Sequence, residues 1–223
     1  MIIYSYKPST GEYIGTGEAK ESPREPGVFL IPANAVTAVP PTAGINEVAC
    51  WNGTKWEKKA DFRGKIYYDK TTKEKHEVTE IGISPNVNWT DVEPADPDAE
   101  WNGSAWEVSL SVFKARKLME IKQAYNSHVA GSFICSLGYP MQFNETDGVK
   151  MEGAIKLLVA NGGTAGYLTD ANDETHYDVP LADIQAVHLE MLVKYAEAHA
   201  KKQVLRQQVK EATTQAELDA IEW

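Results

Sequence analysis

The amino-acid sequence predicts an α+β protein. Its N-terminal half forms mostly small β-hairpin units, and its C-terminal half is an α+β domain with a long C-terminal helix. Five of the six tryptophans and most of the prolines precede residue 110, and long runs with helical periodicity follow it. The first half also contains an internal repeat. We therefore predict a β domain at 1–60, a second β-hairpin unit with a linker at 61–110, and an α+β domain at 111–223.

The internal repeat is a tryptophan pair around an Asn-Gly turn. Residues 50–57, Cys-Trp-Asn-Gly-Thr-Lys-Trp-Glu, recur at 100–107 as Glu-Trp-Asn-Gly-Ser-Ala-Trp-Glu. Asn-Gly tolerates positive φ at both central positions of a tight turn. Each segment therefore predicts a hairpin whose tryptophans pack across its two strands. An isolated hairpin is marginally stable, so each unit must pack on neighbouring strands or on another chain.

Residues that favour strands, bounded by turn residues, continue through the first half. The predicted strands are 2–6, 12–17, 28–31, 35–39, 47–51, 55–58, 65–68 and 75–79. Segments 8–11 and 69–73 are typical of hairpin tips, 22–27 is a loop, and 94–98 is a stiff acidic linker.

The second half begins with a helix from Ser111 to about residue 129, ended by Gly131. The elements that follow are strands at 132–137 and 141–143, a helix at about 147–160, and a hairpin of 166–169 with 175–179. Pro180 opens a long helix to about residue 211, and a capping box at Thr214 starts a short last helix. We expect the long helix to pack on the 111–129 helix or on another chain.

Composition and charge restrict the possible partners. Hydrophobic residues make up 43% of the 223 residues, so the chain can bury a core. The formal net charge of −10 disfavours nucleic acid and anionic membranes, because both attract clustered Lys and Arg. We expect no transmembrane helix and no secretion signal. Cys50 and Cys135 are far apart and predict two free thiols in a reducing cytoplasm.

No segment carries a specific catalytic pattern. The sequence has no Gly-rich phosphate loop, nucleophile elbow or paired-cysteine zinc motif. The acidic stretch around Asp170, Asp173 and His176 is the best candidate for a site, because oxygen ligands near a turn can hold a hard cation. Its spacing differs from calcium loops, and we favour an ordinary polar hairpin tip. We predict a protein that is not an enzyme, with no catalytic residues, metal or cofactor.

Five tryptophans are the candidate partner-binding residues: Trp51, Trp56, Trp89, Trp101 and Trp106. Tryptophan is enriched at protein-binding hot spots, and its flat ring also suits the face of a sugar. The third interpretation is that the paired tryptophans form the core of very small β units. We favour the core interpretation, and the other two stay open.

Several segments of the first half resemble proteins encoded beside phage and prophage tail fibres. They are Ile3–Tyr13, Pro26–Ala35, the Trp-Asn-Gly motif with Trp56, and Phe62–Asp69. Residues 111–223 are similar to a C-terminal domain of unknown function that is common in the same loci. The similar features are the Lys-rich first helix, the hairpin around Gly138, and the segments 167–170 and 216–221.

The resemblance implies a tail-fibre assembly chaperone, or a fibre-associated protein, that binds a phage tail-fibre protein. Such a protein acts in the cytoplasm of the bacterial host during assembly, by binding alone. The alternative is a permanent virion component, such as a receptor-binding fibre tip or a baseplate protein, whose helices self-associate with symmetry mates. A sugar-binding module and an enzyme are further alternatives. A glycan array with Trp→Ala variants would test the former, and the latter requires a convergent polar pocket.

Overall fold

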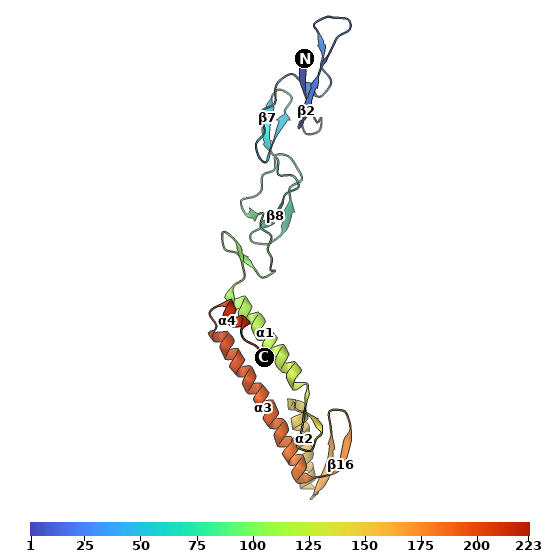
Figure 1. The fold of residues 1–223 in the computed structure, drawn as a ribbon, viewed down its shortest axis with the longest axis vertical. Helices are drawn as coiled ribbons and strands as arrows, with labels where there is room; N and C mark the ends of the chain where they lie inside the picture. Colours follow the sequence, from blue (N-terminus) through green and yellow to red (C-terminus); the bar gives the residue numbers. More distant parts are fainter. The chain divides into compact units, whose positions relative to one another are not determined.

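The computed structural model describes residues 1–223 and confirms the predicted α+β fold. The chain forms two compact units, unit 1 (Met1–Glu107) and unit 2 (Val108–Trp223). Short antiparallel strand pairs make up unit 1 (Figure 1). Its strands are β1 (Ile2–Tyr6), β2 (Tyr13–Glu18), β3 (Lys20–Glu21), β4 (Phe29–Leu30), β5 (Ala35–Val36), β6 (Glu47–Trp51), β7 (Trp56–Ala60), β8 (Ile66–Asp69), β9 (Lys75–Glu77), β10 (Trp89–Thr90), β11 (Glu100–Trp101) and β12 (Trp106–Glu107).

Unit 1 uses the same arrangement of strands twice. The strand order is β2-β1-β5 in one sheet and β9-β8-β10 in the other. In both sheets the third strand pairs with the first strand of a hairpin. A tryptophan hairpin follows each sheet, β6–β7 in the first repeat and β11–β12 in the second. The structural repeat is therefore much longer than the eight-residue sequence repeat that indicated it.

The two sheet hairpins turn in the same way, at the tips predicted from the sequence. The amide of Gly11 donates to the carbonyl of Lys7, and the amide of Lys73 donates to the carbonyl of Asp69, both at 2.8 Å. Gly11 and Lys73 both have positive φ, of 73° and 62°. The matching geometry shows that this turn accepts a residue other than glycine.

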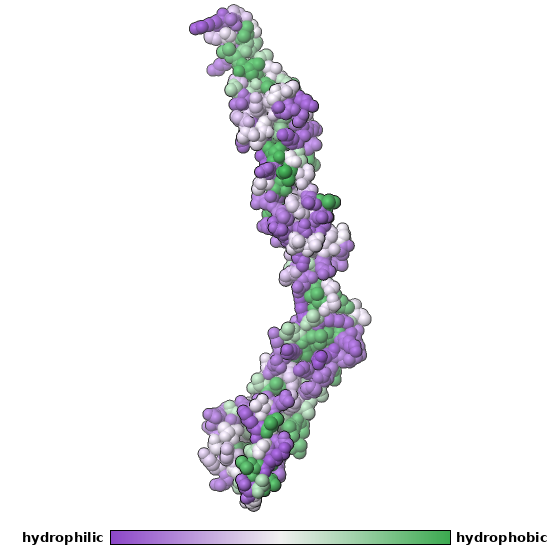
Figure 2. Space-filling model, turned by 180° about the vertical axis from the view of Figure 1, so that it is seen from behind, coloured by the Kyte–Doolittle hydropathy of each residue, from purple (hydrophilic) through white to green (hydrophobic).

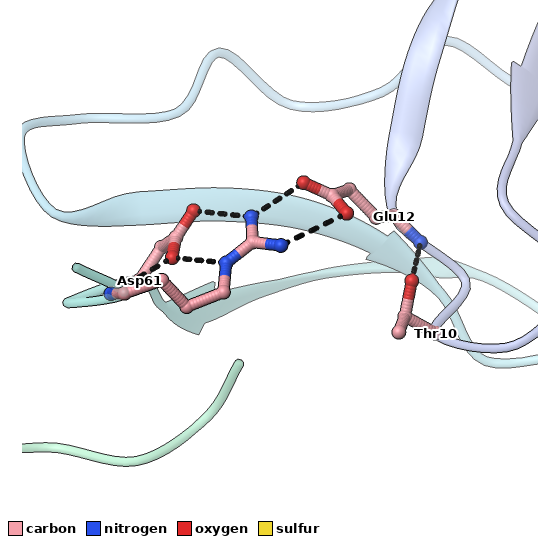
Figure 3. A network of polar contacts seen from close by, with 4 residues as sticks. Thr10, Glu12 and Asp61 are labelled. Atoms are coloured by element: carbon pink, nitrogen blue, oxygen red, sulfur yellow. Dashed lines mark hydrogen bonds and ion pairs between the residues drawn. The ribbon is translucent and has the colours of Figure 1, made fainter. Parts of the chain in front are cut away.

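One arginine joins the first hairpin to the chain segment after β7 (Figure 3). Arg63 donates through Nη2 to Oε1 of Glu12 at 2.5 Å, and through Nε to Oδ1 of Asp61 at 2.7 Å. The planar guanidinium can satisfy two carboxylates at once. Its hydrogen bond lowers the pKa of Asp61, because it stabilises the ionised form.

Unit 2 is built on two antiparallel helices that lie side by side, α1 (Leu110–Val129) and α3 (Leu181–Glu211) (Figure 1). The other elements are the hairpin β13 (Ser132–Ile134) with β14 (Pro140–Gln142), α2 (Glu145–Ala160), the hairpin β15 (Ala165–Thr169) with β16 (Thr175–Pro180), and α4 (Gln215–Asp219). Two clusters of buried hydrophobic residues form the core, one around Val187 and Met191 and one around Val209 and Leu218. The predicted capping box at Thr214 is present.

The Asn-Gly turns differ from their prediction in one respect. Only Gly53 and Gly103 have positive φ, of 97° and 107°. Asn52 precedes the two central positions, and its Oδ1 accepts hydrogen bonds from the amides two and three residues ahead, both at 2.9 Å. Asn102 does the same. The asparagine therefore closes the turn through its short side chain, and glycine alone supplies the left-handed backbone.

Several strands are also shorter than predicted. The predicted strand 35–39 ends at Val36, because Ala38 leaves the sheet and its carbonyl accepts a hydrogen bond from Trp56. The strand 28–31 shortens to β4, and 132–137 shortens to β13. The two-residue strands β3 and β10 were not predicted, since such short pairs leave no periodic signal in the sequence.

Candidate partner-binding surface

The first tryptophan hairpin carries a cluster of four aromatic rings. Trp51 and Trp56 face each other across the strands with their ring centroids 5.5 Å apart, edge to face. Tyr6 stacks on Trp51 at 6.3 Å, and Tyr13 meets Trp56 edge-on at 5.8 Å. Offset-stacked and edge-to-face arrangements are the favourable ones for aromatic pairs. The cluster therefore joins this hairpin to the neighbouring sheet.

The second hairpin repeats the pair without the tyrosines. Trp101 and Trp106 lie 5.4 Å apart at an interplanar angle of 73°. The ammonium group of Lys70 lies 5.6 Å from the centroid of Trp101. Cation–π contact of this kind is attractive. The second pair thus has a more polar environment than the first.

Both hairpins are held by the indole N–H of their second tryptophan. Trp56 donates to the carbonyl of Ala38, and Trp106 donates to the carbonyl of Val92, each at 2.8 Å. Each carbonyl lies two residues beyond the third strand of the preceding sheet. The indole hydrogen bond therefore ties each hairpin to its own sheet and fixes the orientation of the ring.

Trp89 does not join the paired tryptophans. It lies on β10, where its ring stacks on His76 at 4.2 Å and on Tyr67 at 6.4 Å. Its role is to cover one face of the second sheet. The five candidate residues therefore fall into three separate places: the first hairpin, the second hairpin and β10.

All five candidate tryptophans are half-buried. Both buried hydrophobic clusters lie in unit 2, and the fully buried residues of unit 1 are few and mostly small or aromatic. The tryptophans consequently supply the packing that holds unit 1 together, and part of each ring stays accessible to a partner.

The sequence did not indicate a second apolar surface, which lies along β4 of the β3–β4 hairpin. Val28, Phe29, Leu30 and Ile31 are consecutive, with exposed fractions of 46%, 36%, 54% and 47%. β4 pairs only with β3, so one edge of its backbone is open. An open edge with exposed apolar side chains is typical of a strand that accepts another strand. The sequence feature that could have revealed this surface is the unbroken apolar run at 28–31, where a half-buried strand would alternate apolar and polar residues.

The acidic tip at 170–178 is organised by its own hydrogen bonds. Asp170 is buried, and its Oδ1 accepts from the amides of Asn172 and Glu174 at 2.8 and 3.1 Å. Its Oδ2 lies 3.2 Å from Nε2 of His176, whose ring stacks on Tyr139. Burial alone would raise the pKa of Asp170, but these hydrogen bonds outweigh it and lower the pKa. The carboxylate is thus occupied by the turn.

No three metal-binding side chains lie close enough together to hold a metal ion. No helix has both the length and the apolar character needed to cross a bilayer. The lack of catalytic residues stays a prediction.

The fold and the exposed aromatic and apolar surfaces together define a two-unit α+β protein with small aromatic β-hairpins. Residues 112–222 match the family model described as a domain of unknown function, DUF4376. This match covers nearly all of unit 2 and none of unit 1. No curated protein and no solved structure matches the chain.

Proposed function

We propose that the protein is a non-enzymatic tail-fibre assembly chaperone, or a fibre-associated protein, that binds a phage tail-fibre protein. The observation that carries the proposal is the open edge of β4, with exposed apolar side chains at the four consecutive positions 28–31. The resemblance of the segments in unit 1 to proteins of tail-fibre loci supplies the identity of the partner.

The mechanism is protection of an unfinished fibre. A fibre subunit that has not yet formed its trimer exposes apolar strands, which aggregate readily. A strand of this kind can add to the open edge of β4, where backbone hydrogen bonds give affinity and Phe29 and Leu30 give apolar contacts. The half-buried tryptophans hold the hairpins and sheets of unit 1 together.

Co-expression with the tail-fibre protein of the same phage or prophage tests the proposal. The wild-type chain should be retained by tagged fibre and should raise the yield of soluble fibre. The variant Phe29→Ser/Leu30→Ser should lose most of both effects. Ile45→Ser is the matched control, because Ile45 is 92% exposed but lies outside the strands. Equal retention of the two variants would contradict a role for β4.

The alternative, a permanent virion component that self-associates, rests on a different observation. Leu189, Val193 and Val204 are 62%, 46% and 58% exposed on α3. They lie on the side of the helix away from the buried residues Val187, Ala198 and Leu205, so α1 does not cover them. An exposed apolar stripe on a helix is a surface on which the helix of a symmetry mate can pack. A fixed copy number in purified particles would favour this alternative over a transient chaperone.

A further inference from the structure

The helix pair of unit 2 has one covered side and one open side. On the covered side, Nζ of Lys117 donates to the carbonyl of Ile221 at 3.5 Å, and Lys201 lies over the ring of Trp223. α4 and the C-terminal residues therefore close this side of the α1–α3 seam. The opposite side holds a groove of about 320 Å³, lined by Leu118, Ile121, Lys122, Lys202 and Arg206.

The groove combines an apolar floor with cations that have no carboxylate partner. Ile121 is buried, and Leu118 is 38% exposed beside it. None of Lys122, Lys202 and Arg206 forms an ion pair, although the chain has ten more acidic than basic residues. Lys202 is held in place by the ring of Tyr125, 3.9 Å from its ammonium nitrogen.

Helical spacing extends this character along the open side. His199, Lys202, Arg206 and Lys210 recur at three- and four-residue steps on α3, and Ala115, Leu118 and Lys122 do so on α1. Neither series contains a carboxylate. The single acidic residue of α1, Glu120, points to the other side, where it pairs with Lys117 at 2.8 Å. Further along α3 the hydroxyl of Tyr195 donates to Oε2 of Glu145 on α2 at 3.3 Å.

We propose that this groove binds an acidic amphipathic helix of a partner protein. A groove between two antiparallel helices has the shape that takes the apolar stripe of a third helix. The unpaired cations match carboxylates that flank such a stripe, and charge complementarity of this kind selects partners and speeds their encounter. The apolar floor and the net charge of −10 favour a protein helix over nucleic acid. The inference goes beyond tail-fibre binding by β4 and does not depend on it.

The test uses the full chain and a fluorescent synthetic peptide with leucines along one helical face and glutamates beside them. One control peptide replaces the glutamates with lysines, and another replaces the leucines with serines. Fluorescence anisotropy should show binding of the first peptide alone, weakening with added salt. Lys122→Glu/Arg206→Glu should weaken binding at least tenfold, and Lys122→Gln/Arg206→Gln should weaken it less.

The matched control is Lys156→Glu/Lys194→Glu, which changes the net charge equally at exposed lysines away from the groove. Its dissociation constant for the first peptide should stay within about twofold of the wild-type value, since surface charges at this distance are screened. A dissociation constant above about 100 μM for the first peptide would overturn the proposal. Equal losses for the two charge-reversal variants would overturn it as well, and so would tighter binding of a DNA oligonucleotide. A pull-down of the Lys122→Glu/Arg206→Glu variant with tagged fibre measures tail-fibre binding by β4 separately from peptide binding in the groove.

Discussion

The substitution Gly11→Ala tests whether the first hairpin turn is shaped by its contact with β6. Gly11 has a φ of 73°, and a Cβ built on it would overlap the carbonyl oxygen of Trp51. The carbonyl of Gly11 also accepts the amide of Trp51 at 2.8 Å. Lys73 occupies the same turn position in the second repeat with a φ of 62°. Positive φ alone therefore does not require glycine there, whereas the close approach of β6 does.

Two contributions set the size of the effect. Left-handed backbone costs an alanine about 1–2 kcal/mol relative to glycine. Separating the turn from β6 to make room for the methyl group loses the hydrogen bond to Trp51, about 1 kcal/mol, together with some packing. We expect Gly11→Ala to lower the free energy of unfolding of unit 1 by about 2–4 kcal/mol. Gly53→Ala should cost only about 1–2 kcal/mol, because no atom lies within 4 Å of the added Cβ.

Urea unfolding with two probes separates the units. Five of the six tryptophans lie in unit 1, so tryptophan fluorescence follows mainly that unit. Circular dichroism at a helical wavelength follows mainly unit 2, which contains all the helices. Gly11→Ala should shift the fluorescence transition and leave the helical transition in place. Equal shifts for Gly11→Ala and Gly53→Ala would refute the close-approach explanation.

Three further predictions concern local interactions. Gly53→Val and Gly103→Val should each lower the free energy of unfolding of unit 1 by roughly 1–3 kcal/mol, because a β-branched residue resists positive φ. Unchanged midpoints of the fluorescence transition would show that the turns do not need glycine at these positions. The pKa of Asp61 is lower in the folded protein than the usual value of about 3.9. The hydrogen bond to Arg63 therefore stabilises unit 1 above that pH. This contribution is lost as the pH falls through the folded-state pKa of Asp61. In Asp61→Asn the free energy of unfolding of unit 1 should therefore fall less steeply at acid pH than in the wild type. The same fall in the variant and the wild type would rule out the Asp61–Arg63 ion pair as its cause. Thr214→Ala removes the cap of α4 and should lower the free energy of unfolding by about 1 kcal/mol in the helical transition. An unchanged transition would show that the capping box does not stabilise unit 2.

Local patterns in the sequence were enough to predict the elements whose stabilising contacts lie within a few residues. The tryptophan hairpins follow from Asn-Gly between paired aromatic residues, and the capping box from Thr214 and Glu217. The helices at 111–129 and 180–211 follow from apolar spacing over many turns, and the structure differs by one residue at the start of each. In all these cases the residues that interact are neighbours along the chain.

Only the tertiary structure decided which distant segments meet. The carbonyls of Ala38 and Val92 accept the indole hydrogen bonds, Trp89 stacks on His76, and Arg63 reaches Glu12 across 51 residues. It also decided that the C-terminal residues cover one side of the α1–α3 seam and leave the cationic side open. A single sequence does not specify such contacts, because two-residue strands, backbone acceptors and the choice between two sides of a helix leave no periodic pattern.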